Sequence, residues 1–415
     1  MSLPAALDAL DSAAIARDVG RLVRERSITG QERGAAARLV ELAHALGLRA
    51  TLDEHDLEAL RAHPGHPGEE APRTELVSAT VTLPGSDPQA PRLCVNGHLD
   101  VVPAGTESWA RDPWAGAVDV GAGSVYGRGS VDMKGGVVAA LHALGALRAA
   151  GPPLPGDVVL QAVPSEEDGG LGTFAALRRD AAFAACLIPE PTELRIVCAH
   201  GGALTFTGVV RGRSAHAAAR LEGVSAIDRY IPIHAALHAH ERAVNERPRH
   251  PLLAGHALPY PLLVGRLQAG RWSSQVPAEL HFEGRLGVPV GESLEAARAG
   301  LERAVAAATD DVGPPVQISW SGGQFAPGET DTADPWVGLV RDAAAAELGS
   351  PPPLVGVGYG ADMRLYRDRA IPCVMFGPSG IRLAHAVDER VSIGELLTVA
   401  RVVVRSAVAF GGQHG

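Results

Sequence analysis

The stretch Asp157-Val-Val-Leu-Gln-Ala-Val-Pro-Ser-Glu-Glu-Asp-Gly-Gly170 joins an apolar run to an acidic turn that ends in two glycines. Residues 157–163 predict a short buried strand, and residues 171–182 have the apolar spacing of a helix. The alternation extends in both directions, with strands expected at 76–83, 92–96, 186–188 and 371–376 and helices at 10–25, 32–47, 135–150, 333–348 and 393–410. This pattern predicts an α/β fold with a mixed, largely parallel sheet.

The middle of the chain has a different order of elements. Strands are expected at 204–211, 260–268, 278–287 and 315–320, and helices at 224–243 and 292–309. Their β-α-β-β-α-β order is the ferredoxin-like arrangement. We therefore predict two domains, one formed by residues 1–202 and 323–415 and a second, residues 203–322, inserted into it.

Composition narrows the function classes. With 415 residues, the chain has room for two or three domains. A net charge of −10 argues against a nucleic-acid binder or a polybasic membrane-surface protein, and we expect neither partner. There is no apolar run of membrane-spanning length and no signal-like start, and four widely spaced cysteines are typical of reduced thiols. These features predict a cytoplasmic protein.

The Lys and Arg residues number 37 and include a single lysine, Lys134. Because a compact ammonium and a planar guanidinium bind differently, we expect a site-specific reason for this lysine.

A histidine and an aspartate follow the predicted strand 92–96, in Gly97-His98-Leu99-Asp100. Ligands of open α/β sheets bind at the carboxyl ends of the strands. Residues two apart in extended chain face the same way, so one of the pair can bind a metal ion. The other can then hydrogen-bond the free ring nitrogen. The alternative is a polar strand end without function.

Two consecutive glutamates, Glu166 and Glu167, follow the strand 157–163. Consecutive side chains of extended chain point in opposite directions. One glutamate can therefore ligate a metal ion while its neighbour reaches a water molecule on that ion. The alternative is a solvated acidic loop.

Three further residues complete the set. Asp132 lies among glycines at a predicted helix start, where its two carboxylate oxygens can bridge two metal ions or, alternatively, cap the helix. Glu190 follows the strand 186–188 and lies between two prolines, which restrict its backbone. His385 follows the strand 371–376. Together these clusters give a mixed nitrogen and oxygen ligand set suited to Zn²⁺ or a similar divalent ion.

The order of these motifs, above all Asp132-Met-Lys-Gly-Gly136 and the Glu166-Glu167 pair, resembles the M20 metallopeptidase family. That family includes acetylornithine deacetylases, succinyl-diaminopimelate desuccinylases, aminoacylases and glutamate carboxypeptidases. The resemblance covers nearly the whole chain. It implies a zinc-exopeptidase-like catalytic domain with an inserted ferredoxin-like lid that also forms a homodimer.

The resemblance also implies roles for the residues. His98 and Glu190 would bind one divalent ion, Glu167 and His385 the other, and Asp132 would bridge both. Zn²⁺ is the expected metal, with Co²⁺ or Mn²⁺ as alternatives. Asp100 would orient His98, Glu166 would be the general base, and the Asp132–Met133 peptide would be cis.

Residues of the substrate pocket are expected from the same resemblance. His216 matches a lid histidine that reaches an active site, often the partner subunit's, and polarises the substrate carbonyl. Arg285 and Arg364 are the candidates to bind a substrate carboxylate, and Gly360 lies in a glycine-rich pocket segment. The segment Ser273-Ser-Gln-Val-Pro277 lacks an asparagine found in many relatives, which puts the usual substrate contacts in doubt.

Two enzymatic functions fit these residues. The first is a deacylase of small N-acyl amino acids, similar to acetylornithine deacetylase, and the second is a zinc exopeptidase acting on small peptides. A non-catalytic metal-binding protein is a third alternative, disfavoured by the intact Glu166-Glu167 pair and His216. His234, His238 and His240 on the predicted lid helix are expected at a surface or a subunit contact.

Overall fold

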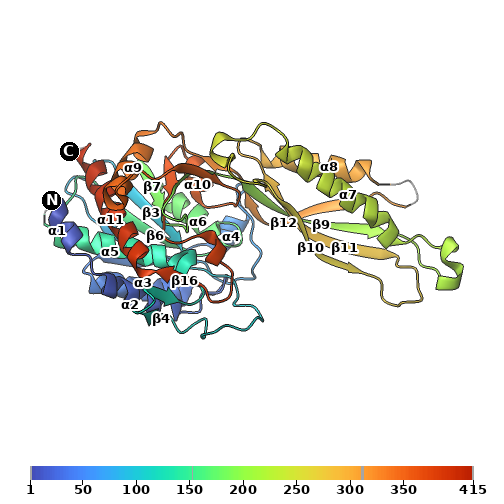
Figure 1. Ribbon diagram of the computed structural model, residues 1–415, viewed down its shortest axis with the longest axis horizontal. Helices are drawn as coiled ribbons and strands as arrows, with labels where there is room; N and C mark the ends of the chain where they lie inside the picture. The colour runs from blue at the N-terminus through green and yellow to red at the C-terminus, as the bar shows by residue number, and fades with distance from the viewer. Residues whose placement is uncertain (1, 152, 310–312, 414–415) are drawn as a thin grey trace.

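The computed structural model describes residues 2–151, 153–309 and 313–413. Figure 1 shows a larger body that carries both ends of the chain and a smaller, elongated body beside it. We call the smaller body the lid. Its elements are β9 (Gly202–Arg211), α7 (Ala226–Asn245), β10 (Leu262–Ala269), β11 (Glu279–Val288), α8 (Leu294–Ala307) and β12 (Gln317–Phe325).

The larger body is built on a nine-stranded sheet with the order β1-β2-β6-β3-β7-β15-β8-β13 and with β14 beside β8. The strands are β1 (Arg49–Glu54), β2 (Val77–Leu83), β3 (Leu93–His98), β6 (Val158–Val163), β7 (Ala185–Ile188), β8 (Ile196–His200), β13 (Gly328–Glu329), β14 (Leu354–Val357) and β15 (Cys373–Met375). Strands β6, β3, β7 and β15 run parallel to one another, whereas β2 runs antiparallel to both of its neighbours, β1 and β6. This mixed sheet with a parallel centre confirms the predicted α/β class.

Strands β3, β6 and β7 are buried at every position, because helices cover both faces of the sheet there. Such strands have continuous apolar runs, as in Val158-Val-Leu, instead of an alternating pattern. Helix α5 packs against α2 and α11, and α6 packs against α10. The helices of this body are α1 (Leu3–Asp8), α2 (Ser12–Val23), α3 (Arg33–Ala45), α4 (Leu57–Arg61), α5 (Gly135–Ala149), α6 (Leu171–Arg179), α9 (Pro335–Leu348), α10 (Met363–Arg367) and α11 (Ile393–Gly412).

The lid sheet is antiparallel, with the order β10-β11-β9-β12. Two helices between its strands give the ferredoxin-like order of elements that the sequence predicts. The lid has an apolar cluster of its own, which includes Leu204, Phe206 and Phe282. Independent folding of residues 203–322 as a domain stays a prediction.

Several short elements were not expected. Strand β1 is mostly exposed, so its side chains do not show an apolar pattern. A small sheet, β16-β5-β4, consists of β4 (Ala117–Asp119), β5 (Ser124–Tyr126) and β16 (Arg390–Ser392), and three residues are too few for a periodic signal. Across the described residues, every helix is too short or too polar to cross a membrane.

Candidate active site and metal centre

The candidate ligands lie at one edge of the parallel sheet. His98 ends β3, Glu166 and Glu167 follow β6, Glu190 follows β7, and His385 lies in the loop after β15. These four strands are neighbours and run in the same direction, so their carboxyl ends meet at that edge. The fold therefore brings together side chains that are up to 287 positions apart, from His98 to His385.

Asp132 reaches the same edge from the turn Ser130–Lys134 before α5. The peptide bond after it, Asp132–Met133, is cis, as the resemblance implies. Helix α5 starts very close to the strand end that carries Glu190. A Cβ added at Gly136 would lie 2.2 Å from the carbonyl oxygen of Pro189, so only glycine fits there.

Two groups of side chains can each hold a metal ion, and they share Asp132. The first comprises His98, Asp132 and Glu190, and the second comprises Asp132, Glu167 and His385, with ligand atoms within 4.8 Å of one another in each group. Oδ1 of Asp132 lies 3.0 Å from Nε2 of His98, whereas Oδ2 lies 3.5 Å from Nε2 of His385. The two carboxylate oxygens thus face different groups, which is the geometry of a bridging ligand.

The charges of this cluster indicate that cations belong there. Burial and neighbouring carboxylates raise the pKa of Glu190 and of Glu166 well above the usual range. Hydrogen bonds to Asp132 and Glu167 raise the pKa of His385 to about 10. Because buried carboxylates are costly without a cation, imidazole nitrogens and carboxylate oxygens in this arrangement fit divalent ions such as Zn²⁺.

Asp100 contacts both the candidate metal ligand His98 and the turn that carries Glu166 and Glu167. Its main-chain carbonyl accepts a hydrogen bond from Nδ1 of His98 at 2.8 Å, whereas its carboxylate lies 3.7 Å from that nitrogen. The carboxylate instead accepts the backbone N–H groups of Glu166 and Glu167 at 3.0 and 3.1 Å. The hydrogen bond to His98 therefore comes from the backbone, and the side chain positions the two glutamates.

An ion pair that the sequence analysis did not identify supports two of the candidate ligands, Asp132 and His385. Glu389 is 1% exposed and accepts the backbone N–H groups of Val131 and Asp132 at 2.9 and 3.2 Å. Arg128 donates to Glu389 at 2.7 Å and to the carbonyl of His385 at 3.3 Å. In the sequence, the only indication of this ion pair is that the acidic Glu389 lies four residues after His385 in a loop. The pair links the turn of Asp132 to the loop of His385.

The single lysine lies beside this cluster. Lys134 is fully buried, and its Nζ donates a hydrogen bond to the carbonyl of Glu25 at 2.8 Å. Burial lowers the pKa of Lys134 to about 7. Through this hydrogen bond, Lys134 links the start of α5 to the backbone that follows α2.

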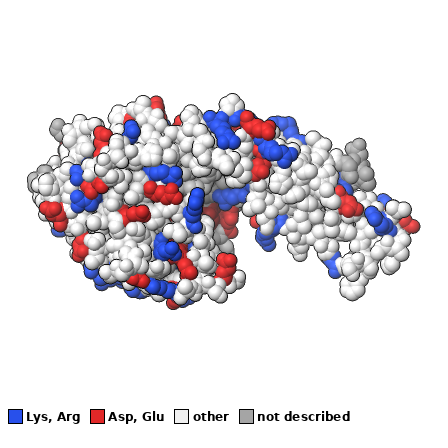
Figure 2. Space-filling model, in the orientation of Figure 1, with Lys and Arg blue, Asp and Glu red and all other residues white. Residues whose placement is uncertain are grey.

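A cavity of about 650 Å³ opens between these groups and the lid; we call it the acid-lined cavity. Figure 2 shows acidic and basic side chains facing the notch between the two bodies. Its wall includes Asp132, Glu166, Glu167, Glu190, His385, Glu70, Arg285, Phe325, Tyr359 and Gly360. Burial raises the pKa of Tyr359, a cavity residue that the sequence analysis did not single out.

The two arginines proposed for a substrate carboxylate have different surroundings. Arg285 lines the acid-lined cavity from β11 and stacks over the ring of Phe325 at 5.4 Å. Arg364 lies outside the cavity lining, is 2% exposed, and donates to the carbonyls of Ala361 and Gly169 at 2.8 and 2.6 Å. Its guanidinium is occupied by the backbone, so the geometry favours Arg285 alone.

His216 does not reach the acid-lined cavity of its own chain. It is exposed and precedes the short helix η2 (Ala217–Glu222), which lies at the end of the lid far from the larger body (Figure 1). Strand β9 starts at the cavity with Gly202 and ends at Arg211. At about 3.3 Å per residue, β9 alone separates the two places by roughly 30 Å.

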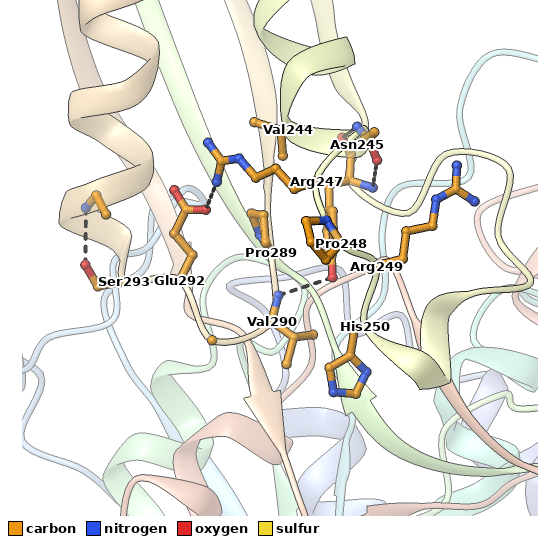
Figure 3. A pocket seen from close by; sticks show the side chains of 13 residues that line it. Val244, Asn245, Arg247, Pro248, Arg249, His250, Pro289, Val290, Glu292 and Ser293 are labelled. Atoms are coloured by element: carbon orange, nitrogen blue, oxygen red, sulfur yellow. Dashed lines mark hydrogen bonds and ion pairs between the residues drawn. The ribbon is translucent and has the colours of Figure 1, made fainter.

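Two of the three lid histidines, His234 and His238, form a surface pair on α7, whereas His240 is half-buried and packs beside Gly300 of α8. Nε2 of His238 lies 3.3 Å from Nε2 of His234, which stacks against Tyr230. A second cavity, of about 560 Å³, lies in the lid near the end of α7 (Figure 3). Arg247 and Glu292 pair with each other in its wall at 2.7 Å, whereas Arg249 and His250 bond to His256 and Glu329 outside the wall. Neither feature belongs to the metal groups found among the described residues.

Comparison with known proteins identifies the family. Residues 94–409 match peptidase family M20/M25/M40. The chain belongs to this family. It is 31% identical to a succinyl-diaminopimelate desuccinylase of Rhodospirillum centenum over 409 residues, covering 94% of this chain and 95% of the relative. As a member of the family it is a hydrolytic enzyme.

Two further relatives illustrate the range of this family. An N-formyl-4-amino-5-aminomethyl-2-methylpyrimidine deformylase of Bacillus subtilis is 28% identical, covering 75% of this chain and 78% of the relative. The solved structure of the di-peptidase Dug1p of Saccharomyces cerevisiae superposes with a TM-score of 0.77 at 15% identity, covering 99% of both chains. Because the Dug1p structure covers nearly the whole chain, this superposition confirms the fold of both the larger body and the lid.

Proposed function

We propose that this M20 enzyme is a deacylase that hydrolyses the amide bond of a small N-acyl amino acid with two divalent ions, Zn²⁺ first among them. The observation that carries the proposal is the pair of ligand groups that share Asp132 on the wall of the acid-lined cavity. Two such ions would polarise the scissile carbonyl and lower the pKa of a water molecule between them.

Glu166 is the proposed general base. It lines the acid-lined cavity but belongs to neither ligand group, so its carboxylate is available for proton transfer. Its backbone N–H is fixed by Asp100 at 3.0 Å, which orients the side chain relative to the adjacent Glu167. Glu166 would take a proton from the attacking water and return it to the leaving amine.

Arg285 is the proposed partner of the substrate carboxylate. Among the described residues it forms no ion pair, and its guanidinium faces a cavity that also holds the scissile site. A guanidinium binds a carboxylate through two parallel hydrogen bonds. Arg285 would therefore orient the free carboxylate of an N-acyl amino acid.

A homodimer through the lid would bring His216 of one subunit to the other subunit's cavity. Strand β10 is an edge strand of the lid sheet; Leu263 and Leu267 on it are 63% and 54% exposed, and Trp272, shortly after its end, is 73% exposed. Unpaired apolar edges of this kind favour strand pairing with a second copy. Four buried free cysteines fit a reducing compartment, so we also propose a cytoplasmic location.

The test is the Glu166→Gln variant, with Glu75→Gln as a control of equal charge change on the surface. Glu166→Gln should keep the metal content of the wild type but lose at least about 10²–10⁴-fold in turnover. Hydrolysis near the wild-type rate would contradict the role of Glu166. An exopeptidase uses the same residues on a peptide bond, so dipeptides belong in the substrate panel beside N-acetyl, N-succinyl and N-formyl amino acids.

A further inference from the structure

Glu70 lines the acid-lined cavity from the Pro/Gly-rich loop between α4 and β2. It belongs to neither metal-ligand group and has no part in the proposed hydrolysis. Glu69, the residue before it, pairs with Arg61 and Arg73 at 2.5 and 3.2 Å. Glu70 forms no such ion pair among the described residues, so its charge is not compensated by the protein.

The backbone of this loop is held against the catalytic turn. Asp168, which follows Glu166 and Glu167 in that turn, accepts the N–H groups of Glu70 and Ala71 at 3.0 and 2.9 Å. Asp168 is itself fixed by buried Arg73 at 2.6 Å. The position of Glu70 is therefore coupled to that of the proposed base.

The side chain of Glu70 is held on its other side by the lid. Oε1 accepts hydrogen bonds from Oγ1 of Thr205 at 3.1 Å and from the N–H of Gly323 at 3.3 Å. A Cβ added at the neighbouring Gly322 would lie 2.3 Å from that oxygen, so the bulge in β12 leaves room for the carboxylate. Oε2 has no protein partner among the described residues, so it can accept a bond from a ligand.

A cation lies on the same face of the lid sheet. Thr205 is directly opposite Arg285 in the ladder between β9 and β11, and opposite residues place their side chains on one face about 5 Å apart. Even so, Arg285 and Glu70 do not form an ion pair with each other in the described structure. The cavity thus presents an anion and a cation, and neither has an ion-pair partner among the described residues.

We propose that Glu70 binds a protonated amine of the substrate, so that the preferred substrates carry an ammonium group in addition to the carboxylate held by Arg285. This inference rests on the proposed function and narrows its substrate class. The ammonium has two sources, a basic amino-acid side chain or the free N-terminus of a dipeptide. An ammonium provides the N–H donors that Oε2 lacks, and a charged hydrogen bond is stronger than a neutral one.

The experiment uses two pairs of substrates in which a methyl group replaces the ammonium. Nα-acetylornithine is compared with Nα-acetylnorleucine, and glycyl-alanine with N-propionyl-alanine. The measured quantity is the ratio of kcat/KM within each pair, for the wild type and Glu70→Gln. Glutamine keeps an oxygen for Thr205 and Gly323, so the change removes mainly the charge.

In the wild type, the ammonium-bearing member of at least one pair should be preferred. Glu70→Gln should lower that ratio by about tenfold, the range expected for one charged hydrogen bond. The pair that responds identifies the source of the ammonium. Glu75→Gln, which removes an equal charge from a surface pair with Arg33, should leave both ratios at the wild-type value.

Thr205→Val separates recognition from a purely structural role. It removes one hydrogen bond to Glu70 without changing the charge, and the ratios should stay close to those of the wild type. If Glu70→Gln and Thr205→Val both lower kcat/KM for all members of the pairs equally, Glu70 only joins the loop to the lid and the inference is overturned. Equal ratios in the wild type and Glu70→Gln overturn it too. A wild type that hydrolyses other N-acyl amino acids but no member of these pairs overturns the inference alone, whereas one that hydrolyses none of the N-acetyl, N-succinyl and N-formyl amino acids refutes the proposed function itself.

Discussion

The ion pair between Glu389 and Arg128 gives the sharpest test of how the candidate metal ligands are positioned. Glu389→Gln keeps an oxygen that can accept the N–H groups of Val131 and Asp132. It removes the charge that faces Arg128, whose side chain is 3% exposed. The change therefore leaves a guanidinium unpaired in the interior while the backbone bonds of the Asp132 turn can persist.

The expected size follows from burial. Removing one partner of a buried ion pair costs about 3–5 kcal/mol in the free energy of unfolding. Residues that orient metal ligands typically change metal affinity by about 10–100-fold when they are substituted. Because the turn carries Asp132, which both ligand groups share, Glu389→Gln should weaken the binding of both ions.

A double-mutant cycle with Arg128→Met provides the control. The pKa of Glu389 is raised to about 7, chiefly by burial, so urea unfolding and zinc competition titrations belong at pH 8, where the carboxylate is charged. The double variant removes both charges and should lose less stability than the sum of the single variants, by about 1–3 kcal/mol. The Arg128→Met single variant accounts for the lost stacking on Trp109. Additive losses, or unchanged zinc affinity in Glu389→Gln, would refute the reasoning.

Three further predictions concern histidines. His385→Ala should bind one divalent ion instead of two in elemental analysis, and retention of two ions would exclude it as a ligand. His216→Ala should lower turnover by about 10²-fold or more at unchanged metal content. If His216 acts in the cavity of the partner subunit, mixing the His216→Ala and Glu166→Gln variants should restore part of the activity. A mixture that recovers no activity would contradict this role across subunits. Burial lowers the pKa of His200 from 6.5 to about 4, so the unfolded chain binds a proton between these values and stability should fall by about 3 kcal/mol as the pH drops from 6.5 to 4. In urea unfolding, the stability of His200→Asn should fall by about 3 kcal/mol less than that of the wild type over this pH range. The same pH dependence of stability in the two proteins would contradict this prediction.

The sequence was most informative where chemistry follows a strand. Residues such as Val158-Val-Leu predict a buried strand, and the acids that follow such a strand must lie at its carboxyl end. Parallel pairing then places His98, Glu167 and Glu190 at one edge. The convergence of these three candidate ligands was therefore predictable from strand direction, whereas Asp132 reaches the same edge from the turn before α5.

Contacts between distant loops were not predictable in the same way. Glu70 reads as part of a solvated Pro/Gly loop, and its place in the cavity depends on Asp168, nearly one hundred positions away. Arg364 and Arg285 look alike in sequence, but only tertiary packing decides that one is buried against carbonyls and the other lines the cavity. For Asp100, the choice between side chain and backbone as the partner of His98 was a matter of less than 1 Å.

The two crossings between the bodies have a consequence for how this enzyme can be rebuilt. Ala203 and Phe325 are ladder partners, as are His200 and Gly328, so the inserted segment leaves and rejoins the larger sheet through neighbouring strands. Ladder partners lie about 5 Å apart, a gap that a two-residue hairpin turn spans. We therefore predict that residues 204–324 can be exchanged as one unit. Such an exchange would replace Arg285 and the lid partners of Glu70 while all five candidate metal ligands keep their places.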